Sequence, residues 1–150
     1  TQVCGILASR KLDEVDGHVF QTPSRINSTW GGNLVDMVRF DRILEIIEED
    51  QLVTKAVRSG SFLLERLQEL EARHESVSAA RGRGLMCAFD LPTPTFRAAV
   101  LNRCHDQGLI ILGCGFSSIR FRSPLTIEEA DIEAGLEILE QAITDTAREG

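Results

Sequence analysis

Basic residues are scarce in this chain. Its 150 residues include 16 lysines and arginines against 23 aspartates and glutamates, which gives a formal net charge of −7. This charge argues against a sequence-independent nucleic-acid binder, because such proteins displace counterions with Lys- and Arg-rich surfaces. It also argues against docking on an anionic membrane, and no apolar run approaches the roughly 20 residues that span a bilayer. The sequence therefore predicts no nucleic-acid partner and no membrane partner.

Reactive side chains are also few. The two lysines, Lys11 and Lys55, lie in polar contexts, whereas a Schiff-base lysine needs desolvation. No Ser/His/Asp set, no nucleophilic cysteine with a partner histidine and no paired carboxylates can be identified. The three histidines, His18, His74 and His105, have no second ligand at a metal-binding spacing. We therefore expect no metal site and no catalytic residue in this chain.

The four cysteines, Cys4, Cys87, Cys104 and Cys114, show no C-x-x-C spacing. Cys87 and Cys104 have apolar neighbours and are predicted to be small buried hydrophobes in a reducing compartment. We therefore expect a cytoplasmic protein. With 43% hydrophobic and 26% charged residues, the chain has the composition of a soluble globular protein of about one domain.

The most informative stretch is a turn rich in hydroxyl groups and glycines, residues 26–33 (INSTWGGN), which precedes a helix predicted over 34–48. Backbone N–H groups and the positive end of the helix dipole point toward such a turn. Ser28 and Thr29 add hydroxyl donors, and the glycines let the backbone approach a ligand. Two interpretations remain open: a phosphate-binding turn, or a helix cap without a ligand.

Hydrophobic periodicity predicts the elements along the chain. Residues 3–8 are typical of a buried strand, 9–25 of a loop, and 52–73 of a second amphipathic helix. Because the first strand begins without any lead-in, we expect this chain to be the C-terminal part of a longer polypeptide. We place a domain boundary near residue 50, with residues 51–150 forming a smaller domain.

The second half alternates strands and helices. Strands are predicted over 77–80, 85–91, 109–112 and 118–122, with turns at 81–84 and 113–115. Thr93 caps a helix that has Pro94 at its first position and ends near Gly108. Thr126–Glu129 is a capping box that begins a last helix. The buried stripe predicted for this helix comprises Ile132, Leu136, Leu139, Ile143 and Ala147. The order β, β, α, β, β, α predicts a small α/β sandwich with its helices on one face of the sheet.

Arg120 is the second candidate functional residue. It lies on the strand predicted over 118–122, and the planar fork of an arginine can bind a carboxylate through two parallel hydrogen bonds. Arg122 lies on the same face by the period of two, so one of the two arginines can be a plain surface charge.

Three motifs resemble those of class III pyridoxal-phosphate aminotransferases. They are Asn27–Asn33 (NSTWGGN), Arg81–Met86 (RGRGLM) and Arg120–Leu125 (RFRSPL), in this order and at these spacings. The STWGGN form is most similar to the lysine 6-aminotransferase (lysine ε-aminotransferase) branch. Ser123 stands where many relatives have proline, which leaves the preceding arginine in place.

The resemblance implies an α/β fold: the C-terminal portion of a fold-type I pyridoxal-phosphate-dependent transferase. Residues 1–50 would form the end of the large domain with a connecting helix, and residues 51–150 the small domain. It implies that Thr29, with Ser28 beside it, binds the phosphate of pyridoxal 5′-phosphate in the partner subunit of a homodimer. It also implies that Arg120 binds the substrate α-carboxylate and that the Schiff-base lysine lies just upstream of Thr1.

The activity implied by the resemblance is transfer of the ε-amino group of L-lysine to 2-oxoglutarate, which gives 2-aminoadipate 6-semialdehyde and glutamate. Two alternatives remain open. One is a related ω-aminotransferase that acts on ornithine, acetylornithine or 4-aminobutyrate. The other is a non-catalytic small-molecule-binding α/β module built from residues 77–148 alone.

Overall fold

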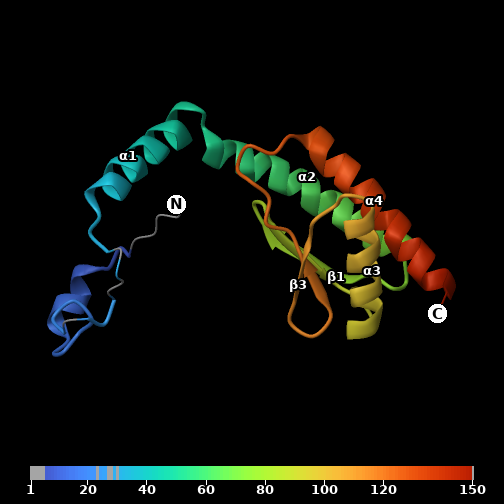
Figure 1. Ribbon diagram of the computed structural model, residues 1–150, viewed down its shortest axis with the longest axis horizontal. Helices are drawn as coiled ribbons and strands as arrows, with labels where there is room; N and C mark the ends of the chain where they lie inside the picture. Colours follow the sequence, from blue (N-terminus) through green and yellow to red (C-terminus); the bar gives the residue numbers. More distant parts are fainter. Residues whose placement is uncertain (1–5, 23, 27–28, 30, 150) are drawn as a thin grey trace. The chain divides into compact units, whose positions relative to one another are not determined.

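The computed structural model describes residues 6–22, 24–26, 29 and 31–149 (Figure 1). The chain divides into two units, Thr1–Asp50 and Gln51–Gly150. The assignment of residues 1–50 to the end of a large cofactor-binding domain stays a prediction.

In the first unit the main element is helix α1, Leu34–Glu49, which confirms the helix predicted over 34–48. A short 3₁₀ helix, η1 (Arg10–Glu14), lies within the predicted loop, and the Ser9 hydroxyl accepts a hydrogen bond from the backbone N–H of Lys11 at 3.3 Å. No residue of α1 is buried. The predicted apolar stripe of this helix is therefore not buried within the described part of the chain.

The prediction of a buried strand over residues 3–8 is wrong for Ile6–Ala8. These residues have no regular structure, and Ile6 is 62% exposed. Residues 3–5 lie outside the described residues. An apolar segment becomes a buried strand only beside a pairing strand, and the strands of the described sheet all belong to the second unit.

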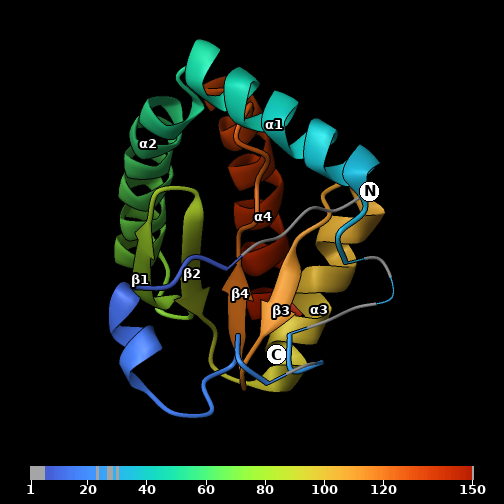
Figure 2. The same cartoon turned by 90° about the vertical axis from the view of Figure 1, so that its left-hand side faces the viewer.

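The second unit is built on a four-stranded antiparallel sheet. Its strands are β1 (Ser78–Arg83), β2 (Met86–Asp90), β3 (Leu112–Cys114) and β4 (Ser118–Arg120), in the order β1-β2-β4-β3. Helices α2 (Leu52–Arg73), α3 (Pro94–Asp106) and α4 (Glu129–Glu149) cover one face of the sheet (Figure 2). The predicted α/β sandwich with helices on one face is confirmed, and the other face of the sheet carries no helix of this unit.

The core lies between the sheet and these helices. Cys87, Phe89 and Ile119 point inward from β2 and β4 and are almost completely buried. Four of the five residues predicted for the buried stripe of the last helix are buried: Ile132, Leu136, Leu139 and Ile143. The fifth, Ala147, is exposed, and the buried face continues through Ala142 and Thr146 instead.

The prediction of a turn over Arg81–Gly84 is wrong for its first three residues, which belong to β1. They pair with Ala88, Cys87 and Met86 of β2. Gly82 is required by packing, because a Cβ atom there would lie 2.5 Å from the Cys87 Sγ. The chain turns at Gly84, which has a φ of +53° that glycine adopts without strain.

The capping residues predicted the ends of α3 correctly, whereas the start of β3 was predicted wrongly. Thr93 and Pro94 begin α3 as predicted, with the Thr93 hydroxyl accepting from the Phe96 N–H at 3.1 Å. Gly108 (φ +86°) ends it in a Schellman motif, because Leu109 N–H donates to the Cys104 carbonyl at 2.8 Å. That bond ties Leu109 to the helix, so the strand does not begin at the predicted residue 109; β3 begins at Leu112, where pairing with β4 starts.

The end of β4 and the start of α4 also differ from the sequence prediction. Strand β4 ends at Arg120, two residues before the predicted end, although Phe121 N–H still donates to the Cys87 carbonyl at 2.8 Å. Helix α4 begins at Glu129, and its cap is not the predicted Thr126. Instead, the Asp131 carboxylate accepts from the Glu128 N–H at 3.4 Å. The Thr126 carbonyl accepts from the ammonium of Lys55.

Candidate active site

The turn before α1 has the donor chemistry that a phosphate needs. Thr29 is exposed, so its hydroxyl is accessible, whereas Ser28 lies outside the described residues. Gly32 has a φ of +77°, and Asn33 caps the helix by accepting from the Val35 N–H at 2.9 Å. The cap interpretation is therefore correct for Asn33. The remaining first-turn N–H groups have no partner within the helix, so the turn also fits the phosphate of a cofactor.

Arg120 ends strand β4 on the sheet face that carries no helix. It is exposed, and it lies opposite Ala88 of β2 and Leu112 of β3. Among the described residues it has no ion-pair partner, unlike most of the arginines in this unit. A guanidinium without a counter-ion is available to bind an anionic ligand.

A cavity of about 340 Å³ lies beside the end of β4, within the second unit. It is lined mainly by apolar side chains, among them Ile111, Phe121 and Ile127. Arg120 and Arg122 both line it. A cavity lined mostly by apolar side chains, with a few charged groups, is typical of small-molecule sites.

A polar cluster that sequence reasoning missed lies next to Arg120 on the open face. Arg81 of β1 donates to the Asp90 carboxylate of β2 at 3.0 Å, and the Ser118 hydroxyl of β4 donates to the same oxygen. Ser118 lowers the pKa of Asp90 most, and Arg81 adds to that effect, so Asp90 is ionised at neutral pH. Had Arg81–Arg83 been assigned to a strand, alternation would have placed Arg81 and Asp90 on one face.

Neither lysine of the chain is placed as a reactive amine. Lys55 is ion-paired with Glu128 and donates to the Thr126 carbonyl at 3.2 Å. Lys11 is exposed in η1. An amine that forms a Schiff base is activated by desolvation, whereas Lys11 is exposed and the charge of Lys55 is stabilised by a carboxylate.

The buried thiols are inert as well. Cys87 and Cys104 are buried, as predicted, and burial raises the pKa of Cys104 to about 11. Within the described ranges no cluster of His, Cys, Asp and Glu side chains could hold a metal ion. None of the described helices is long and apolar enough to cross a membrane.

Comparison with known proteins decides the family. The family model described as aminotransferase class-III matches residues 10–143. The chain belongs to the class-III aminotransferase family. This confirms the resemblance identified in the three motifs. The chain spans about a third of the length of the curated relatives that it matches.

Among these class-III relatives is the L-lysine-epsilon aminotransferase of Mycobacterium tuberculosis. It is 49% identical over 144 residues, which cover 95% of this chain and 32% of that protein. A solved lysine aminotransferase from M. tuberculosis, in its internal aldimine form, matches with a TM-score of 0.85 and 47% identity. That match covers 97% of this chain and 34% of the solved one. The mitochondrial 4-aminobutyrate aminotransferase of Sus scrofa is 32% identical over 124 residues, 82% of this chain and 25% of that protein.

Proposed function

We propose that the protein containing this chain transfers the ε-amino group of L-lysine to 2-oxoglutarate and yields 2-aminoadipate 6-semialdehyde and glutamate. Membership of the class-III family supports an aminotransferase. Identity of 49% to an L-lysine-epsilon aminotransferase, against 32% to a 4-aminobutyrate aminotransferase, favours lysine as the amino donor. The same relationship supports pyridoxal 5′-phosphate as the cofactor. We extend the proposal to a cytoplasmic homodimer.

Arg120 is the structural observation that carries the proposal. Its side chain is exposed on the open sheet face without a counter-ion among the described residues, beside a cavity that it lines. In the proposed site it binds the α-carboxylate of lysine and, in the second half-reaction, that of 2-oxoglutarate. Holding lysine by its α-carboxylate keeps the α-amine at the far end and presents the terminal amine for transfer.

Thr29 would hold the cofactor phosphate through its hydroxyl, with Ser28 beside it and the positive end of α1 adding electrostatic attraction. In the proposed homodimer Thr29 serves the site of the partner subunit. When bound, pyridoxal phosphate supplies the electron sink for amine transfer. The residues of this chain bind and orient; the lysine that attaches the cofactor is proposed to lie in the remainder of the protein.

The visible absorption spectrum of the purified full-length protein tests this function. We expect a cofactor band that L-lysine bleaches in the absence of a keto acid, whereas ornithine and 4-aminobutyrate leave it unchanged. Bleaching by those two amines alone would favour the related ω-aminotransferases. A protein without a band after incubation with pyridoxal phosphate would favour the non-catalytic binding module.

Arg120→Gln and Arg122→Gln form a matched pair for the carboxylate site. Both arginines are exposed and both line the cavity. We expect Arg120→Gln to raise KM for L-lysine and for 2-oxoglutarate at least about tenfold, because loss of a charged partner weakens carboxylate binding. Arg122→Gln should change both constants much less. A larger effect at Arg122 would move the carboxylate site to that residue.

A further inference from the structure

Asp90 lies between two arginines on the open face of the sheet. In the strand register, Ala88 of β2 is opposite Arg81 of β1 on one side and opposite Arg120 of β4 on the other. Asp90 is two residues further along β2 on the same face, and its direct partner on β4 is Ser118. Asp90 is therefore the diagonal neighbour of both arginines, a spacing that long side chains can bridge.

The carboxylate of Asp90 is bound to only one of these arginines. Arg81 donates to Asp90 Oδ1 at 3.0 Å, and the same guanidinium donates to the Ala79 carbonyl at 2.7 Å and to Ser118 Oγ at 3.4 Å. The Ser118 hydroxyl donates to Asp90 as well. Arg120, equally placed by register, makes no ion pair with any described residue.

We propose that Arg81 and Ser118 are positioning residues that hold the Asp90 carboxylate away from Arg120, so that Asp90 does not compete with a substrate carboxylate for that guanidinium. This inference rests on the role of Arg120 in the proposed function. Without Arg81, the Asp90 charge loses its cationic partner, and Arg120 is the other arginine that lies diagonal to it in the sheet. Asp90 then competes with the substrate for the same guanidinium.

A non-reacting dicarboxylate, glutarate, is the probe for this competition in the full-length, cofactor-loaded protein. Arg81→Met removes the charge and keeps the apolar stem. We expect it to raise the inhibition constant of glutarate and KM for 2-oxoglutarate about fivefold, near the upper limit for an exposed ion pair, with kcat little changed. The second variant, Arg81→Met with Asp90→Asn, should restore both constants to within about twofold of the parent protein, because the competing charge is gone.

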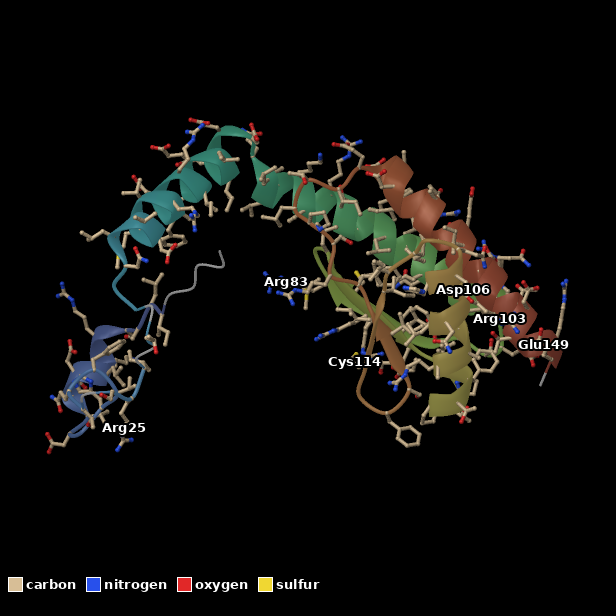
Figure 3. The ribbon with its side chains drawn as sticks, viewed as in Figure 1. Arg25, Arg83, Arg103, Asp106, Cys114 and Glu149 are labelled. Atoms are coloured by element: carbon tan, nitrogen blue, oxygen red, sulfur yellow. The ribbon has the colours of Figure 1, made fainter. Side chains whose placement is uncertain are left out.

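Arg83→Met is the matched control. Arg83 lies on the same strand and face as Arg81, is exposed, and points away from the helices (Figure 3). It has the same charge but lies opposite Met86 rather than next to Asp90, and it forms no ion pair among the described residues. A general loss of positive potential would weaken glutarate binding equally in both variants, whereas the positioning role affects only Arg81→Met.

Three outcomes would overturn the inference. If Asp90→Asn does not rescue Arg81→Met, then Arg81 contributes directly to anion binding or to the fold, and thermal melting separates those two causes. If Arg81→Met equals Arg83→Met, the effect is general electrostatics. If Arg120→Gln leaves glutarate binding unchanged, the carboxylate site itself is misplaced, and this failure of the proposed function is distinct from the other two.

Discussion

At the scale of single residues, Gly60 shows a packing constraint that the sequence does not reveal. It lies in the interior of α2, where glycine costs about 1 kcal/mol relative to alanine. A Cβ atom at this position would lie 2.1 Å from the backbone carbonyl carbon of Gly84. Gly60→Ala should therefore force α2 away from the β1–β2 turn and lower the free energy of unfolding by about 2 kcal/mol. Urea denaturation of the purified protein measures this change.

Gly135→Ala is the control for that prediction. Gly135 is also a helical glycine, in α4, but an added Cβ would meet only the Leu109 Cδ1 at 3.4 Å, an ordinary contact. Here the better helix propensity of alanine should prevail and stabilise the protein by up to about 1 kcal/mol. If both variants lose the same stability, close approach at Gly60 is not the cause.

At the scale of elements, α2 and α4 are joined by ion pairs in which α2 carries the basic group and α4 the acidic one. Arg66 pairs with Glu133 at 3.2 Å, and Glu140 binds Arg73 at 3.0 Å and also His74, the residue that follows α2, at 2.8 Å. Burial raises the pKa of Glu140, but the hydrogen bonds from His74 and Arg73 outweigh this effect and leave the pKa below its ordinary value of 4.5.

Because the pKa of Glu140 is lower in the folded state than in the unfolded chain, its contribution to stability is complete above about pH 4.5 and disappears as the pH falls through the folded-state pKa. Glu140→Gln should therefore destabilise the protein at pH 7, by less than about 1 kcal/mol since the pair is partly exposed and screened. The difference from the parent protein should vanish at acid pH. Chemical denaturation at several pH values measures it.

Glu137→Gln is the matched variant for this comparison. Glu137 is exposed on the same helix and has no ion-pair partner among the described residues. The free energy of unfolding of the Glu137→Gln variant should equal that of the parent protein at every pH. A pH-dependent loss of equal size in both variants would assign the effect to the net charge of the helix rather than to the contacts of Glu140.

The helices and strands also show which structural features could be predicted from the sequence and which could not. Signals that act within a few residues were sufficient for α3, where Thr93 with Pro94 and the glycine at 108 predicted both ends, because capping is local. They were not sufficient for α4, whose predicted cap at Thr126 is wrong. Strand limits depend on partners distant in sequence. The segment 81–83 resembles a turn by composition, yet its pairing with β2 makes it a strand.

The candidate site follows the same division. The sequence around Arg120 made this residue a candidate for carboxylate binding. In the structure it is exposed and lies beside a cavity. The contact between Arg81 and Asp90 joins residues on two strands, and that of Ser118 with Asp90 spans 28 positions. Both depend on the register of a sheet that periodicity alone does not determine.

At the scale of the whole molecule, the proposed function assigns binding groups to this chain, whereas neither of its two lysines is placed for covalent attachment of the cofactor. Lys55 is held by Glu128, and exposed Lys11 lacks desolvation. Borohydride reduction of the cofactor-loaded full-length protein, followed by peptide mass spectrometry, should place the cofactor on neither residue. The variants Lys11→Arg and Lys55→Arg should both retain the visible cofactor band.

An unreduced sample serves as the control, because it should release the cofactor on denaturation and give no labelled peptide. Cofactor found on Lys11 or Lys55 would contradict the division of labour proposed between this chain and the remainder of a protein whose relatives are about three times as long. Cofactor found on a lysine outside the chain would fit it. In that case the covalent chemistry belongs to the rest of the protein, and the proposed roles of Thr29 and Arg120, which are to bind anionic groups, are what this chain contributes.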